Sequence, residues 1–385
     1  MTEDVLILAA RRTAVAPRGG VFRNLQADEL AAPVIEALLS DAGLGKDAVD
    51  HVIFGNALYG GGNPARMAAL RAGLPEHIPA MTLDSQCCSG MDAILQACHL
   101  VRAGAARCVI AGGMESFSRS PIRMHRPLIA GEKPVEYTRP PFSPDPAMDP
   151  DMTEAAAALA AELSIPRESQ AAYAVRSHEK AMAAWRAGEL LEELVTVPGA
   201  VLDYDAFTRS LDFRTAMRAP VLAGDRATGV SVATAAVEAD GGAAVIVAHP
   251  DLVTTAIARS SRVAPVIFRG GLTRGGSSAQ PALVPVACLQ ELLQRLDLSV
   301  ADIETYELME AYAAQAMATS DLLGLPSDRI NLGGGALSRG HPIGASGAIL
   351  VVRLFQQLSG LASGISGIGL IAGVGGLGVC LCLGS

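Results

Sequence analysis

Two distant segments of the chain share one pattern of apolar and polar positions. Residues 34–56 read VIEALLSDAGLGKDAVDHVIFGN, and residues 288–310, which lie 254 positions further on, read CLQELLQRLDLSVADIETYELME. In both, apolar residues recur at the spacing of one helix face, and a short acidic turn then leads into a run that is typical of a buried strand. The pattern predicts the same helix–turn–strand unit twice, and therefore a duplicated α/β chain.

A second pair of segments repeats in the same order. CSGMDAILQACHLVRAGAARCVIAGG, from Cys88, resembles ASGAILVVRLFQQLSGLASGISGIGLIAGVGG, from Ala345, because each has Ser-Gly, an apolar helix and a buried strand that ends in glycines. A similar offset carries Cys87 close to His341. If the two halves face each other, these residues lie at equivalent ends of a pseudo-twofold axis. The alternative is a chance likeness of two alanine-rich segments.

The region between the halves differs from them in composition and periodicity. Residues 119–150 are rich in proline, arginine and methionine without periodicity, and the next segment predicts two helices that are split at Ile165-Pro166. We therefore expect an N-terminal half formed by residues 1–118 and 246–255. An inserted, largely helical region would cover residues 119–245, and a C-terminal half residues 256–385.

Composition narrows the class of protein. With 385 residues, half of them hydrophobic, the chain is long enough for two core units. A net charge of −9 argues against a nucleic acid or an anionic membrane as partner, and no window is long and apolar enough for a membrane span. The short apolar run at the N-terminus predicts a first strand, since a signal peptide needs a longer one.

The cysteines are odd in number, seven, and most lie within apolar runs. This pattern favours free thiols in a reducing cytoplasm. Cys380 and Cys382 have no second ligand pair at zinc spacing, so we expect no metal site.

Cys87 has two interpretations, ordinary packing and a nucleophile. The sequence after it, CSGMDAILQAC, predicts a helix that begins just beyond the thiol. Unpaired N–H groups and the positive end of the helix dipole would then face the sulfur and lower its pKa.

His341 lies in NLGGGALSRGHPIGASGA, residues 331–348, with glycines on both sides and a proline directly after it. The glycines let other groups approach closely, and Pro342 fixes the backbone. This frame favours a base or hydrogen-bond donor over an ordinary surface histidine.

At this point the chain resembles the thiolase family over nearly its whole length. The matching motifs are C-x-S-G at 87–90, GGMES at 112–116, EAYAAQ at 310–315 and GGALSRGHPIGASGA at 334–348. AARRTAVAPRGGVF near the start and NPARMAALRAGLP at 63–75 agree as well. The resemblance implies two α/β halves stacked as a five-layered α-β-α-β-α core, with a loop domain inserted into the first half.

The resemblance also implies an activity and its residues. Cys87 would take an acyl group from coenzyme A, His341 would activate it and contribute to one oxyanion hole, and the N–H of Cys87 would contribute to the other. No permanent cofactor is implied, only an acyl-CoA or acyl-carrier thioester as substrate, and the chain would form a homodimer or a dimer of dimers. The remaining assignments are supporting or oxyanion roles for Glu310, Gly340 and Val374, and coenzyme A contacts for Met152, Ala236, Ser346 and Gly347.

The chain departs from the family pattern at several site positions. The second reactive cysteine of the family is Ala372, and Val374 stands where a glycine N–H is expected. The asparagine of the family's N-E-A-F motif is Met309, its His-Met pair is Asp151-Met152, and its Asn-Ala-Ser segment is Thr234-Ala235-Ala236. Acyl transfer to Cys87 remains possible, whereas Claisen condensation lacks its usual α-proton base.

Four functions follow from this pattern. The first is a specialised biosynthetic acyltransferase whose carbon acceptor needs no cysteine base, for example an activated or decarboxylating one. The second is an ordinary acetyl-CoA acetyltransferase or 3-ketoacyl-CoA thiolase in which Cys88, Cys380 or a water replaces the base. The third is acyl transfer to a heteroatom, or hydrolysis. The fourth is a non-catalytic, partner-dependent subunit, against which the intact Cys87 and His341 argue.

Overall fold

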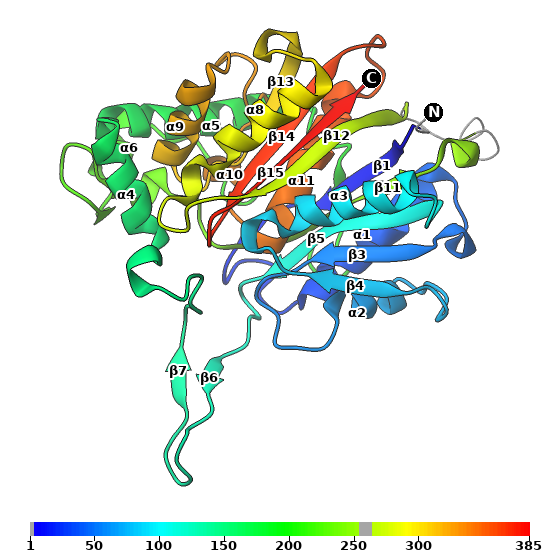
Figure 1. Cartoon of the computed structure of the whole chain (residues 1–385), viewed down its shortest axis with the longest axis horizontal. Helices are drawn as coiled ribbons and strands as arrows, with labels where there is room; N and C mark the ends of the chain where they lie inside the picture. The colour runs from blue at the N-terminus through cyan, green and yellow to red at the C-terminus, as the bar shows by residue number, and fades with distance from the viewer. Residues whose placement is uncertain (1–3, 254–263) are drawn as a thin grey trace.

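The two sequence repeats form the two halves of one 11-stranded sheet (Figure 1). The computed structural model describes residues 4–253 and 264–385, so the expected boundary between 255 and 256 lies outside the described residues. The strand order is β13-β14-β15-β12-β1-β11-β5-β3-β4, and β1 pairs antiparallel with β12 where the halves join. Figure 1 places the second-half strands above those of the first half.

The first half contains the following elements: β1 (Leu6–Thr13), β2 (Ala16–Pro17), α1 (Ala27–Ala42), β3 (His51–Gly55), α2 (Pro64–Arg71), β4 (Ala80–Leu83), α3 (Ser89–Arg102), β5 (Cys108–Ser116) and β11 (Ala239–Ala248). The second half contains β12 (Val266–Gly275), α8 (Val284–Leu296), β13 (Ile303–Leu308), α9 (Ala313–Leu323), α10 (Ala336–Arg339), α11 (Ile343–Leu358), β14 (Ser366–Gly373) and β15 (Leu377–Gly384).

The predicted duplication is confirmed element by element. The first repeat forms α1 and β3 in one half and α8 and β13 in the other, and the second repeat forms α3 with β5 and α11 with β14. Strand order repeats too, because β3-β5-β11-β1 corresponds to β13-β14-β15-β12.

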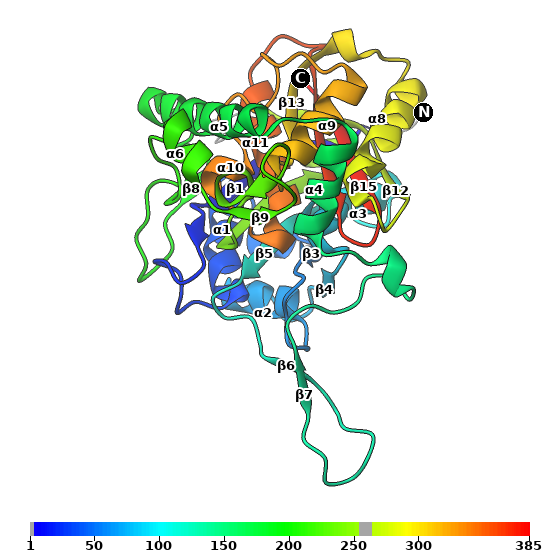
Figure 2. The same cartoon turned by 90° about the vertical axis from the view of Figure 1, so that its left-hand side faces the viewer.

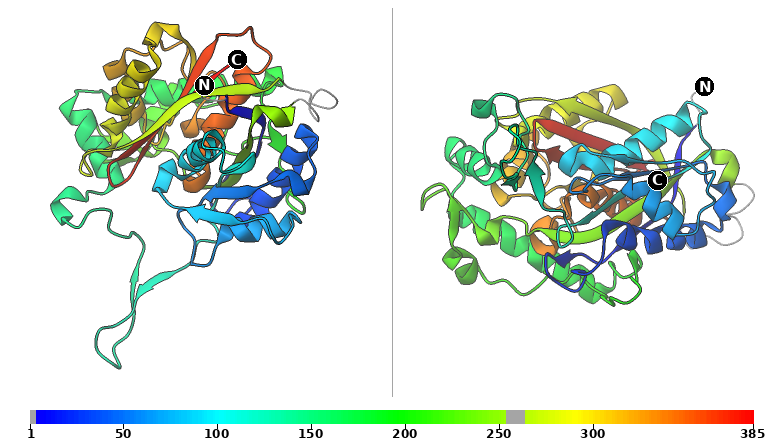
Figure 3. Two further views of the ribbon diagram at one scale, coloured as in Figure 1. Left: turned by 45° about the vertical axis from the view of Figure 1, so that its right-hand side comes forward. Right: turned by 90° about the horizontal axis from the view of Figure 1, so that it is seen from below.

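Five layers result from how the helices bury their apolar faces. Helices α3 and α11 pack against each other and against strands of both halves, in one continuous core (Figures 1 and 3). Helices α1 and α2 cover the outer face of the first half, and α8 and α9 cover that of the second. The α3–α11 contact is close because Gly347 lacks a side chain: a Cβ there would lie 2.6 Å from the backbone nitrogen of Met91. None of the described helices is long and apolar enough to cross a membrane.

The inserted region leaves β5 and returns into β11. It contains a hairpin of β6 (Arg123–His125) and β7 (Val135–Tyr137), which projects away from the body (Figures 1 and 2). Next come α4 (Met152–Glu162) and α5 (Arg167–Ala187), which are split at Pro166 as predicted. The remaining elements are β8 (Leu194–Val195), α6 (Phe213–Arg218), β9 (Val221–Ala223) and β10 (Val230–Ser231).

The expected end of the insertion at residue 245 is wrong. Strand β11 begins at Ala239, is buried along its whole length, and lies between β1 and β5 in the middle of the sheet. Ser116, the last residue of β5, pairs with Asp240. Residues 239–245 therefore belong to the first half, because their backbone groups complete its sheet.

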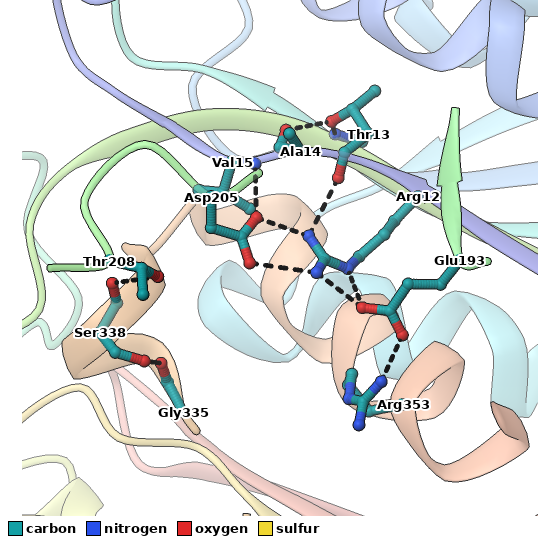
Figure 4. Close-up of polar contacts among 11 residues, drawn as sticks. Arg12, Thr13, Ala14, Val15, Glu193, Asp205, Thr208, Gly335, Ser338 and Arg353 are labelled. Atoms are coloured by element: carbon teal, nitrogen blue, oxygen red, sulfur yellow. Dashed lines mark hydrogen bonds and ion pairs between the residues drawn. The ribbon is translucent and has the colours of Figure 1, made fainter. Parts of the chain in front are cut away.

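A buried network of ion pairs connects the insertion to β1 and α11 of the core (Figure 4). Arg12 of β1 donates to Glu193 Oε1 at 2.6 Å and to both carboxylate oxygens of Asp205, at 2.7 and 3.0 Å. Arg353 of α11 donates to the other oxygen of Glu193 at 2.6 Å. Burial alone would raise the pKa of Glu193, but the two guanidinium groups hold it below its ordinary value. The insertion is thus tied to the helix that follows His341.

Candidate active site

Cys87 lies in a single 3₁₀ turn, Gln86–Cys88, between β4 and the start of α3. The predicted helix after the thiol is therefore confirmed. Gln86 has φ = 56°, which an L-residue rarely adopts, and this left-handed residue turns the chain so that Cys87 faces inward. The sulfur of Cys87 lies 3.3 Å from Nε2 of His341. The offset between the repeats thus predicted the pairing correctly.

His341 lies between α10 and α11, where the backbone is tightly fixed. Gly340 has φ = 109°, and a Cβ there would lie 2.9 Å from the Cβ of Ala239. The N–H of Gly340 donates to Ala336 and that of His341 donates to Val237, both at 2.8 Å. Gly340 is therefore a conformational support, and its N–H is not available to an oxyanion.

Ser346 determines which nitrogen of His341 carries the proton. Its hydroxyl lies 2.7 Å from Nδ1 of His341 and 3.1 Å from the carbonyl oxygen of Pro342. The hydroxyl has one proton, and the carbonyl can only accept it, so the hydroxyl accepts from Nδ1–H. Nε2 is then unprotonated and can take the proton of Cys87.

The thiol and the imidazole form a neutral pair. The lowered pKa expected for Cys87 is not found: burial raises it to about 11, although the backbone N–H groups of Val374 and Cys87 act in the opposite direction. Burial also lowers the pKa of His341 to about 4. Burial therefore favours the neutral form of each group, S–H and free imidazole, and the N–H groups of Val374 and Cys87 act on the sulfur in favour of its charged form.

The pair opens into a cavity of about 370 Å³. Met152 and Ala236 line this cavity together with Cys87, His341 and Val374, as the resemblance implies. Ala372 and Met309 line it as well, so both departures from the family pattern lie within the site.

Ser346 and Gly347 do not have the expected position. Both are buried in α11 and neither lines the cavity, because Ser346 bonds His341 and Gly347 packs on Met91. A direct contact of these two residues with coenzyme A is therefore not supported. Ser346 contacts His341 from the first turn of α11, and Gly347 lies against α3.

Glu310 is also outside the cavity wall. The residue is 2% exposed, and its carboxylate accepts from Ser177 at 2.7 Å and from Asn331 at 2.6 Å. These contacts join α5 of the insertion to the glycine loop ahead of α10. Glu310 therefore supports the loop that carries His341.

Glu115, in the GGMES motif, has a comparable supporting role that the sequence did not single out. It accepts from the N–H of Gly344 at 2.9 Å and from those of Ala57 and Leu58, and burial raises its pKa to about 7. It holds the first turn of α11 against the loop after β3.

Cys88 and Cys380 lie away from the cavity. Cys88 is fully buried, and its thiol faces the carbonyl of Ile371 at 3.7 Å. Cys380 packs against Cys288, with 3.2 Å between the sulfurs, on the outer side of the second half. Burial raises the pKa of both Cys88 and Cys380 well above its ordinary value, so neither is a suitable replacement base.

Three further cavity residues were not predicted as site residues. They are Gln280, ahead of the 3₁₀ turn Pro281–Leu283, and Tyr312 and Gln315, at the start of α9. The signal for Tyr312 was its place in EAYAAQ, where the family motif has phenylalanine. Gln280 lies in a loop without a local pattern, so its orientation depends on tertiary packing.

Comparison with known protein families assigns both halves of the chain to one family. The thiolase N-terminal domain matches residues 5–251, and the thiolase C-terminal domain matches residues 267–384. The chain belongs to the thiolase family.

Several full-length relatives are similar to it. The protein named "Putative acetyl-CoA C-acetyltransferase YhfS" from Bacillus subtilis is 37% identical over 382 residues, with 98% of each chain covered. "Putative acetyl-CoA C-acetyltransferase VraB" from Staphylococcus aureus strain MRSA252 is 34% identical over 378 residues, with 97% of each covered.

Solved structures agree with the fold. The acetyl-CoA acetyltransferase of Bacillus anthracis matches with a TM-score of 0.90 at 27% identity, over 100% of this chain and 99% of that one. Human mitochondrial 3-ketoacyl-CoA thiolase in complex with CoA matches with a TM-score of 0.88 at 26% identity, over 100% and 98%. The fold and relatives support an acyltransferase that uses acyl-CoA thioesters.

Proposed function

We propose that the chain is an acyltransferase that takes an acyl group from acyl-CoA onto Cys87 and transfers it to a carbon acceptor in a specialised biosynthetic reaction. The observation that carries the proposal is the 3.3 Å contact between Cys87 and His341 within a cavity that also contains Ala372. Of the described residues that line this cavity, Cys87 alone is a cysteine. The first half-reaction has its groups, and the usual base for the second is absent.

In the first half-reaction, Nε2 of His341 takes the thiol proton while the sulfur of Cys87 attacks the thioester carbonyl carbon. The carbonyl oxygen becomes an oxyanion, which the N–H groups of Cys87 and Val374 are positioned to stabilise. The intermediate then expels the coenzyme A sulfur, which takes the proton back from His341. A carbanion from the acceptor next attacks the acyl carbon on Cys87 and releases the cysteine sulfur.

The missing cysteine determines what kind of acceptor fits. At Ala372 no side chain can take an α-proton from a second acyl-CoA, and general bases contribute about 10²–10⁴-fold to rate. An acceptor that becomes a carbanion by decarboxylation, or that is already activated, avoids this step. The burial of Cys88 and Cys380 argues against a substitute thiol.

Mass spectrometry of the intact protein, followed by digestion, tests the first half-reaction. Acetyl-CoA should add an acetyl group to Cys87 in the wild type and in Cys88→Ala, but not in Cys87→Ala. An adduct that persists in Cys87→Ala would contradict the assignment of the nucleophile.

Ala372→Cys tests the specialised function. The wild type should make and cleave acetoacetyl-CoA slowly, and Ala372→Cys should raise both rates, modestly if Met309 still limits the oxyanion hole. Wild-type thiolysis at about 10 s⁻¹ or more, an ordinary enzyme rate, would refute the specialised function in favour of an ordinary thiolase.

We further propose a homodimer or a dimer of dimers in the cytoplasm, with acyl-CoA or an acyl-carrier thioester as donor. All seven cysteines are free thiols, which suits a reducing compartment. Sedimentation of the purified chain measures the oligomeric state.

A further inference from the structure

Arg123 lines the cavity and has no ion-pair partner among the described residues. It is the first residue of β6, at the base of the projecting hairpin, and it is partly buried (Figure 2). Within the described part of the chain, its side chain donates one hydrogen bond, from Nη2 to the carbonyl oxygen of Ala57 at 3.2 Å. A guanidinium has five N–H donors, so most of them remain available to another group.

The other charged side chains of the cavity wall each have a compensating partner. Arg139 donates to the two carboxylate oxygens of Asp149, at 2.5 and 3.2 Å. Glu238 accepts from Arg18 at 2.8 Å. Asp151 is the N-cap of α4 and accepts from two backbone N–H groups of its first turn, where the helix dipole stabilises a negative charge. The charge of Arg123 is therefore the one that these partners leave unbalanced.

The rest of the cavity wall does not balance this charge. Its uncharged polar residues are Gln86, Thr138, Gln280, Tyr312 and Gln315. Burial raises the pKa of Cys87 and lowers the pKa of His341, so burial favours the neutral form of both. The other residues of the wall are apolar or glycine. A cation in such surroundings attracts anions, and a partly desolvated charge gains most from a partner of opposite sign.

Arg123 is connected to the His341 side of the cavity. The N–H of Ala57, whose carbonyl accepts from Arg123, donates to Glu115 at 3.0 Å. Glu115 also accepts from the N–H of Gly344 at 2.9 Å, three residues after His341. One carboxylate thus fixes both the loop that Arg123 contacts and the turn that follows His341. A ligand group beside Arg123 therefore shares the cavity with the transferred acyl group.

We propose that Arg123 selects a substrate whose reacting portion carries a carboxylate, such as the half-thioester of a dicarboxylic acid. The planar fork of a guanidinium matches the two oxygens of a carboxylate, and this charge-assisted pair is stronger than a neutral hydrogen bond. The carboxylate belongs either to the acyl group that Cys87 receives or to the carbon acceptor. The inference rests on the proposed acyl transfer, for which it names the substrate class.

The experiment has two arms. The first measures acylation of Cys87 by malonyl-, succinyl- and glutaryl-CoA against propionyl-, butyryl- and valeryl-CoA, which have the same numbers of acyl carbons. The second starts from acetylated enzyme and offers the same thioesters as acceptors, with the carbon–carbon product measured by mass spectrometry. All of them carry the same coenzyme A phosphates, so a difference in rate reports on the acyl or acceptor portion. The arm that shows the preference identifies the substrate that carries the carboxylate.

The wild type should prefer one carboxylate-bearing member by about 10- to 150-fold, the range for a hydrogen bond to a charged group. Arg123→Gln, which keeps a donor for Ala57 without the charge, should bring this ratio close to one. Arg123→Lys keeps the charge without the fork and should retain part of the preference. Arg126→Gln, at an exposed residue of the same hairpin that does not line the cavity, is the control and should leave the ratio unchanged.

Three results would overturn the inference and leave the proposed function intact. One is a wild type that accepts and transfers charged and uncharged groups of equal length at the same rate. Another is a preference that is unchanged in Arg123→Gln. The third is an Arg123→Gln variant whose KM rises by the same factor for every CoA thioester, because Arg123 would then bind a phosphate of coenzyme A. Absence of a Cys87 adduct with all of the thioesters would instead contradict the proposed function itself.

Discussion

Replacing His341 by alanine should convert a nearly pH-independent acylation into one that rises with pH. In the wild type the pKa of His341 is lowered to about 4, so the base is free from about pH 5 upward and lost only as pH falls through its pKa. In the variant only the thiolate can attack. With a Cys87 pKa of about 11, the thiolate fraction is about 10⁻⁴ at pH 7 and about 10⁻² at pH 9.

These fractions set the size of the effect. The variant should be slower by up to about 10⁴-fold at pH 7 and about 10²-fold at pH 9, and by at least about 10²-fold at pH 7 even if free thiolate is the better nucleophile. A plot of the logarithm of the variant's rate against pH should have a slope near one.

The assay is rapid-quench mass spectrometry of the Cys87 adduct formed from acetyl-CoA across this pH range. Ultraviolet absorbance of the thiolate, taken as the difference from Cys87→Ser, gives the Cys87 pKa separately from the other cysteines. His77→Ala is the control, because His77 is exposed and does not line the cavity. A wild-type thiolate that is already present below about pH 7 would refute the reasoning, since the pair would then be ionic.

Two further substitutions test the supporting residues. Ser346→Ala should slow acylation by about 5- to 150-fold and leave the KM for the thioester unchanged. The factor corresponds to about 1–3 kcal/mol, the cost of leaving a buried donor of His341 unpaired. A raised KM with an unchanged rate would contradict the orienting role. Glu193→Gln should lower the free energy of unfolding by about 3 kcal/mol or more, because the buried arginines lose a countercharge. Denaturant unfolding measures this loss of stability. Glu192→Gln, at the exposed neighbouring residue, is the control and should not lower the free energy of unfolding. Equal stability of the two variants would contradict the prediction.

The fold and the contact between Cys87 and His341 could be predicted from the sequence for a common reason. Both depend on a long-range periodicity, which preserves order and spacing when the halves are compared, so the offset that aligns α1 with α8 also aligns Cys87 with His341. Helix and strand types follow from the same apolar spacing. A pattern that recurs at one offset shows which residues occupy equivalent positions in the two halves, and a single window of sequence cannot show this.

The remaining features depend on contacts between distant segments. The start of β11 at Ala239 follows from pairing with Cys108–Ser116, whereas local composition near residue 240 is as rich in glycine and alanine as the segment before it. Ser346 lies in a motif that the resemblance assigns to the ligand, and only the packing of α11 turns its hydroxyl toward His341. The orientation of Gln280 depends on the turn that follows it and on β14.

The pairing of Ser116 with Asp240 has a consequence for how this protein can change. The inserted region begins and ends on neighbouring residues of two adjacent antiparallel strands, so without it β5 and β11 would be a simple hairpin. Closing a long loop costs only slightly more entropy than closing a medium one, and insertions between such fixed ends leave strand register intact. The insertion supplies Met152 and other wall residues, whereas Cys87 and His341 come from the two halves. Under the proposed acyl transfer, exchange of this one segment between relatives would change the cavity wall and leave the Cys87–His341 pair as it is.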